Sequence, residues 1–234
     1  MQKYWYLIPC ALFAACLTIG MWPTARGEDM QRSAITTQPS TKPIWQSEIN
    51  GTQTLIIIRH GEKPPPGLGQ LTPRGLNRAL AWSKLIPERF GRPDFLFAPD
   101  PREMIMDAGY SYSYLRPIAT IEPLAIRLQM AVRTPFGHTH ISELQQELLQ
   151  ANYANSTSVI VWEHLNAEKL ARNILATFDS DAKPVPVWTD DDYDSAFVIK
   201  ITRTRGRKPT LIFTHEKFPM PDLSDDMPEP ARKN

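Results

Sequence analysis

Three continuous apolar runs, each bounded by turn residues, dominate the hydrophobic pattern of the chain. They cover residues 54–58, 94–98 and 159–162. Short apolar runs without alternation are typical of strands that are buried on both faces, as in parallel sheets. The pattern therefore predicts three central strands, spread over more than a hundred residues of sequence.

Helical periodicity fills much of the space between these runs. Thr72 is a good capping residue for a helix that begins directly after it. A second helical stretch is predicted over residues 112–129, where Pro117 and Pro123 require a break or a kink. Residues 167–178 give the clearest helix, because their apolar positions repeat at i, i+3, i+4 and i+7.

The end of the pattern predicts a hairpin, because residues 195–202 and 210–218 alternate or run apolar around the charged turn 205–208. Strands that alternate with helices favour an α/β domain, here over residues 54–218. We expect a three-layer α/β/α sandwich whose central sheet is mostly parallel and carries an antiparallel C-terminal hairpin. Residues 219–234 are predicted to be an irregular tail.

The first residues have the pattern of an export signal. One lysine precedes the uncharged residues 4–22, and small residues follow near position 27. Residues 1–27 are therefore predicted to be a signal peptide, or alternatively an uncleaved anchor that attaches the protein to a membrane through residues 4–22. Residues 28–53, rich in Ser, Thr, Gln and Pro, are predicted to be a polar spacer. An extracytoplasmic location follows, periplasmic in a bacterium.

Composition and charge exclude several kinds of function. Both cysteines, Cys10 and Cys16, lie in the first segment, so a chain cut after residue 27 has no disulfide, thiolate metal site or cysteine nucleophile. The same cut leaves 24 basic residues against 25 acidic ones, without a basic run. Nucleic acid is therefore not expected as a partner.

Candidate chemistry lies at the ends of two of the apolar runs. The first run ends in Arg59, His60 and Gly61, and the third is followed by Glu163 and His164. Ligands of parallel sheets bind at the carboxyl ends of strands, so neighbouring strands would place both histidines in one pocket. Neutral imidazole is a nucleophile, arginine holds two phosphate oxygens, and glycine lets the backbone turn close to a ligand. Attack on a phosphoryl group fits this set.

Four motifs, in this order and spacing, resemble the histidine phosphatase superfamily, also called phosphoglycerate-mutase-like: RHGEKP, LTPRGLNRA, RPIATIEPLA and VIVWEH. The resemblance covers residues 53–202 and points to an exported bacterial member. It implies that His60 accepts the phosphoryl group as a phosphohistidine. Arg59, Arg116 and His164 would hold the phosphate oxygens, and water would then release phosphate. Neither a cofactor nor a metal is implied.

The leaving oxygen also needs a proton, and the sequence offers several acids. Glu163, beside His164, is the first choice and Glu62 the second; Asp100 and Glu143 stay open as alternatives. Neighbouring residues on a strand point to opposite faces, which counts against Glu163 if the strand continues through it.

Other polar features have simpler interpretations. Arg102 is expected to be a solvated loop arginine. His138 and His140 have the alternate spacing of a metal pair, but no third ligand is evident. The acidic residues 189–194 lack the glycine and the final glutamate of a calcium loop and are predicted to be a solvated turn. His215 is expected to be structural.

Together these observations predict a phosphatase that hydrolyses a phosphate monoester, either a small phosphorylated molecule or an envelope component. The alternative is a non-catalytic protein that binds a phosphorylated or anionic envelope ligand. A mutase is disfavoured, because the phosphorylated sugar acids that it needs are cytoplasmic.

Overall fold

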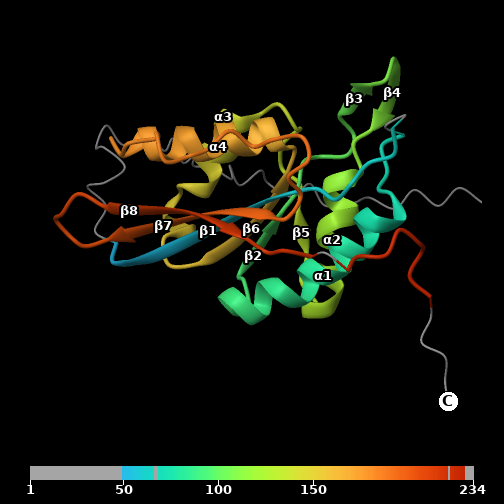
Figure 1. The fold of residues 1–234 in the computed structure, drawn as a ribbon. Helices are drawn as coiled ribbons and strands as arrows, with labels where there is room; N and C mark the ends of the chain where they lie inside the picture. The colour runs from blue at the N-terminus through green and yellow to red at the C-terminus, as the bar shows by residue number, and fades with distance from the viewer. Residues whose placement is uncertain (1–48, 66–67, 221, 230–234) are drawn as a thin grey trace, which may run out of the picture. The chain divides into compact units, whose positions relative to one another are not determined.

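The computed structural model describes residues 49–65, 68–220 and 222–229. The main sheet of this part of the chain has the strand order β5-β2-β6-β1-β7-β8 (Figure 1). Its strands are β1 (Gly51–Arg59), β2 (Phe95–Phe97), β5 (Val132–Arg133), β6 (Thr157–Trp162), β7 (Ser195–Arg203) and β8 (Thr210–Lys217). The first four in the order run parallel, and β7 and β8 are antiparallel. The predicted sheet with its C-terminal hairpin is confirmed.

Helices cover both faces of this sheet (Figure 1). Helices α1 (Pro73–Phe90) and α2 (Arg116–Leu128) lie on one face. Helices α3 (Ile141–Leu148) and α4 (His164–Thr177) lie on the other, and a short 3₁₀ turn, η2 (Ala151–Tyr153), leads into β6. The expected three layers are therefore present.

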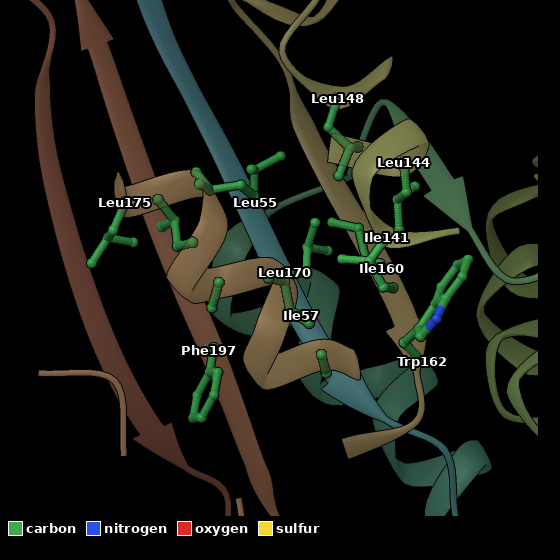
Figure 2. Packing of buried hydrophobic residues seen from close by; sticks show 14 of the residues in the cluster. Leu55, Ile57, Ile141, Leu144, Leu148, Ile160, Trp162, Leu170, Leu175 and Phe197 are labelled. Atoms are coloured by element: carbon green, nitrogen blue, oxygen red, sulfur yellow. The ribbon is translucent and has the colours of Figure 1, made fainter. Parts of the chain in front are cut away.

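Strand β1 is central because its side chains supply both cores. Leu55 and Ile57 pack with residues of α3 and α4, among them Leu144 and Leu170 (Figure 2). The alternate residues of β1, Ile56 and Ile58, pack with α1 and α2 on the opposite face. All four β1 side chains are fully buried, and burial of each contributes on the order of 2 kcal/mol. This burial fixes the position of β1, whose last residue is Arg59.

The segment before α2 differs from the prediction. Residues 112–129 were expected to be one interrupted helical stretch, but β3 (Met104–Asp107) and β4 (Tyr110–Ser113) form a hairpin and α2 begins only at Arg116. Gly109, at φ +81°, allows the tight turn between the two strands. Helix α2 continues through Pro123, so the expected break is absent.

The two ends of the domain also refine the predicted boundaries. Strand β1 begins at Gly51 rather than at residue 54. The predicted segment 1–27 and most of 28–53 lie outside the described residues. Residues 219–220 and 222–229 contain neither helix nor strand, and the carbonyl groups of Leu223 and Ser224 accept hydrogen bonds from Arg74 and Asn77 of α1. None of the described helices is long and apolar enough to cross a bilayer.

Candidate active site

Strands β1 and β6 bring the two histidine motifs together. They pair in parallel up to Arg59 and Trp162, and the amide of His60 donates to the carbonyl of Trp162 at 3.0 Å. His164 follows Trp162 by two residues. The two motifs therefore emerge at the same edge of the sheet, as predicted, although a hundred residues separate them.

His60 is buried and held in one tautomer. Its side chain lies in the interior, and Nδ1 is 2.8 Å from the carbonyl oxygen of Gly61. A carbonyl can only accept, so Nδ1 carries the proton and Nε2 keeps its lone pair. Burial lowers the pKa of His60 to about 3, and the charges of Arg116 and Arg59 act in the same direction. The imidazole is thus neutral near pH 7 and chemically suited to be a nucleophile.

A close backbone approach fixes the turn after His60. A Cβ atom on Gly61 would meet the carbonyl oxygen of Gly75 in α1 at 2.6 Å, so this position needs glycine for space rather than for an unusual φ. The amide of Gly61 donates to Thr120 Oγ1 at 2.9 Å, and that hydroxyl donates to the carbonyl of Arg116 at 2.8 Å. These bonds attach the first turn of α2 to the nucleophile loop.

Arg59 is bound by the loop of residues 189–194, a contact that the sequence analysis did not predict. Its Nη1 donates to the carbonyl oxygens of Thr189 (3.2 Å), Asp190 (2.7 Å) and Asp192 (3.4 Å), and Nη2 donates to the Tyr193 hydroxyl at 3.2 Å. The guanidinium also stacks 3.9 Å from the Tyr193 ring centre. The prediction of a merely solvated turn at 189–194 is corrected, because its backbone orients Arg59.

Arg116 is buried at the start of α2 and contacts the β3–β4 hairpin. Its Nη1 lies 3.5 Å from Asp107 Oδ2, which also accepts from Lys63 Nζ at 2.7 Å. The hydrogen bond from Lys63 is the largest effect on the pKa of Asp107 and lowers it. Burial raises this pKa by a smaller amount, and the charges of Lys63 and Arg116 lower it further. Tyr114 packs edge-on against His60, with ring centres 6.0 Å apart, and lies beside Arg116.

His164 lies between two carboxylates at the N-terminus of α4. Its Nε2 is 2.8 Å from Asp190 Oδ1. Its Nδ1 is 2.7 Å from Glu163 Oε1, in a charge contact rather than a well-aligned hydrogen bond. These two contacts hold the imidazole of His164 between Glu163 and Asp190 at the start of α4.

Glu163 is the N-cap of α4. Its carboxylate accepts from the amides of Leu165 (2.8 Å) and Asn166 (3.1 Å). Burial alone would raise its pKa, but the contact with His164 and the two amide bonds outweigh burial and lower the pKa to about 2. In this arrangement Glu163 is an ionised structural group, which counts against the role of proton donor that we predicted for it.

The alternative acids have partners elsewhere. Both oxygens of Glu62 accept from the buried Arg78, at 2.9 and 2.6 Å. Asp100 pairs with the exposed Arg102, in agreement with the prediction that this arginine is solvated. Glu143 lies exposed in the first turn of α3. Glu62 and Asp100 are therefore paired with arginines, and Glu143 is exposed.

The remaining histidines are His138, His140 and His215, of which His138 packs edge-on against Tyr114 with ring centres 5.2 Å apart. Glu103 contacts His138 at 3.0 Å and His140 at 3.6 Å, but within the described residues no group of three or more His, Cys, Asp and Glu side chains is arranged to hold a metal ion. His215 Nε2 lies 2.7 Å from Ser195 Oγ, in the hairpin of β7 and β8.

Comparisons with known proteins find similar chains only among solved structures. No family model matches the chain, and no curated protein matches its sequence. A protein assigned as the phosphohistidine phosphatase SixA from Nakamurella multipartitia is 16% identical with a TM-score of 0.47, over 70% of this chain and 96% of that one. One with the same assignment from Agrobacterium tumefaciens is 13% identical with a TM-score of 0.42, over 69% and 97%.

A phosphoglycerate mutase from Bacillus anthracis str. Sterne is 11% identical with a TM-score of 0.43, over 72% of this chain and 93% of that one. These are the kinds of protein that the sequence motifs resemble. At such low identities and TM-scores, function has to be inferred from the geometry of the site itself.

Proposed function

We propose that the protein is a phosphatase of the histidine phosphatase superfamily, which hydrolyses a phosphate monoester through a phosphohistidine on His60. The observation that carries the proposal is the state of this imidazole. It is buried and neutral, and its Nδ1 is bound to a carbonyl, so that Nε2 alone is available for attack. A neutral nucleophile surrounded by fixed cationic donors is what phosphoryl transfer requires of a protein.

In the proposed reaction, Nε2 of His60 attacks phosphorus while the bond to the leaving oxygen breaks. Arg59, Arg116 and His164 stabilise the charge on the phosphate oxygens. Water then attacks the phosphohistidine and releases inorganic phosphate. Arg59 is suited to its role because the loop carbonyls already hold its guanidinium, which reduces the entropy lost when substrate binds.

The test uses residues 28–234, an aryl phosphate substrate and two histidine variants. We expect His60→Ala to release phosphate at least about a thousandfold more slowly than the parent, because loss of a covalent nucleophile removes the whole pathway. His215→Ala, which removes a histidine outside the site, should keep the parental rate. Rapid quenching into base should trap an acid-labile phosphoenzyme in the parent and not in His60→Ala.

A second candidate is a non-catalytic binding protein for a phosphorylated or anionic envelope ligand. It is favoured by the pairing of Glu163 and Glu62 with amides and an arginine, which leaves neither suited to donate a proton. Tight phosphate binding without turnover by the parent would support it.

The proposed setting is extracytoplasmic, with a phosphorylated small molecule or envelope component as substrate. Support comes from the apolar residues 4–22 and from the lack of cysteine after residue 16. Fractionation of cells that express the full chain, with detection of the processed and unprocessed forms, would separate a secreted protein from an anchored one.

A further inference from the structure

Asp190 contacts Arg59 and His164, two of the residues that bind the phosphate in the proposed function. Its carbonyl accepts from Arg59 Nη1 at 2.7 Å, and its carboxylate lies 2.8 Å from His164 Nε2. The backbone and the side chain of this residue therefore bridge the ends of β1 and β6. The rest of the carboxylate is open to water, with a side-chain exposure of 91%. Asp190 thus lies at the mouth of the site.

Other carboxylates near the site are already engaged. Glu163 accepts two helix amides, Glu62 accepts two bonds from Arg78, and Asp107 contacts both Lys63 and Arg116. Asp192 accepts from Ser195 Oγ at 2.6 Å, and Asp194 pairs with Arg78. Within residues 49–65, 68–220 and 222–229, His164 is the one side chain that we find at hydrogen-bonding distance from the Asp190 carboxylate.

The contact with His164 also places the Asp190 carboxyl group beside the expected position of the phosphate. Its Oδ1 lies 2.8 Å from His164 Nε2, on the side of the imidazole opposite to Glu163. A bound phosphate would take the Nε2–H bond for itself. Its negative charge would at the same time favour the protonated form of a carboxyl group beside it.

From this geometry we propose that Asp190 is the general acid of the reaction, an assignment that rests on the proposed phosphatase function. As the bond from His60 Nε2 to phosphorus forms, the phosphorus–oxygen bond of the ester breaks and its electron pair goes to the leaving oxygen. That oxygen takes the proton of the Asp190 carboxyl group. In the second step the Asp190 carboxylate takes a proton from the water whose oxygen bonds to phosphorus, and the electron pair of the nitrogen–phosphorus bond returns to Nε2.

The test compares Asp190→Asn with Asp181→Asn, a substitution at an exposed aspartate outside the loop 189–194, whose carboxylate accepts from the amide of Lys183. The measured quantity is kcat/KM for 4-nitrophenyl phosphate, whose leaving group needs little protonation, and for phenyl phosphate, whose leaving group needs more. We expect Asp190→Asn to lose about 100-fold on phenyl phosphate and less than about fivefold on 4-nitrophenyl phosphate. Asp181→Asn should change both by less than about twofold.

The outcomes separate this inference from the proposed function. If the parent shows no His60-dependent phosphate release, both are overturned. If the parent is active and Asp190→Asn loses equally on both substrates, Asp190 only positions His164, and the inference alone is wrong. The inference is also wrong if Asp190→Asn binds inorganic phosphate more tightly while its leaving-group dependence is unchanged, because Asp190 is then only an anion that occupies the phosphate position.

Discussion

Glu163 stabilises the helix that follows it, and this role can be measured apart from catalysis. We expect Glu163→Gln to lower the free energy of unfolding by about 1 kcal/mol at pH 7, because the capping charge at the N-terminus of α4 is lost. Its pKa is lowered to about 2 from an ordinary value of 4.5, so the stabilisation is complete above pH 4.5 and disappears as pH falls toward 2. Urea unfolding at pH 7 and pH 3 measures the difference.

Glu163→Asp is the matched control, since it keeps a charged cap and should recover most of the lost stability. In the kinetic comparison of phenyl and 4-nitrophenyl phosphate, Glu163→Gln should affect both substrates equally. A loss confined to phenyl phosphate would show that Glu163 donates the proton and would contradict its assignment as a structural cap.

Residues of the site that lie at the end of an apolar strand are easier to predict from the sequence than residues on an irregular loop. Arg59, His60 and His164 each follow a strand that the apolar pattern identifies, so their meeting point can be inferred from strand order alone. Asp190 and Tyr193 reach the site through a loop without periodicity, and the sequence shows only that this loop is acidic. Contacts made by backbone carbonyls, such as those to Arg59, leave no compositional signal at all.

At the scale of elements, Arg78 joins three segments around the nucleophile. It projects from α1, binds both oxygens of Glu62 in the loop after β1, and contacts Asp194 just before β7. Removing one partner of a buried ion pair leaves an uncompensated charge. We therefore expect Arg78→Met to lower the free energy of unfolding by about 3 kcal/mol, measured by urea denaturation.

The neighbouring Arg74 provides a control on the same helix and the same carboxylate. It is a third exposed and lies 3.4 Å from Glu62, so Arg74→Met should cost less than about 1 kcal/mol. Equal losses in the two variants would contradict the expectation that burial of Arg78 makes its ion pair the stronger one.

Elements were predictable where a pattern covers many residues. The apolar strands and the periodic α4 were expected within a few residues, whereas β5 has only two residues and offers no pattern to detect. The β3–β4 hairpin was not predicted, and its last two residues, Tyr112 and Ser113, were included in the predicted helix because true helical periodicity follows them directly. Its turn depends on Ala108 and Gly109, both at positive φ. A local turn of this kind has no periodic pattern by which the sequence could reveal it.

For the whole molecule, the neutral state of His60 links the site to global stability. The folded protein holds this imidazole with a pKa of about 3, against an ordinary value of 6.5, mainly through burial. Between these values the unfolded chain binds a proton that the folded protein does not bind. Stability therefore rises with pH in this range, and it is lost as pH falls below 6.5.

We expect the parent to lose about 2 kcal/mol more unfolding free energy than His60→Asn between pH 6.5 and pH 4.5, since asparagine has no proton to bind. Glu163 contributes little in this range, because its ordinary pKa of 4.5 sets the upper limit of its own effect. Other histidines are common to both proteins and cancel in the difference. Urea unfolding at half-unit pH steps gives the two curves. Parallel curves would mean that the folded protein leaves the pKa of His60 at its ordinary value, and the buried, neutral imidazole on which the proposed reaction depends would then be contradicted below pH 6.5.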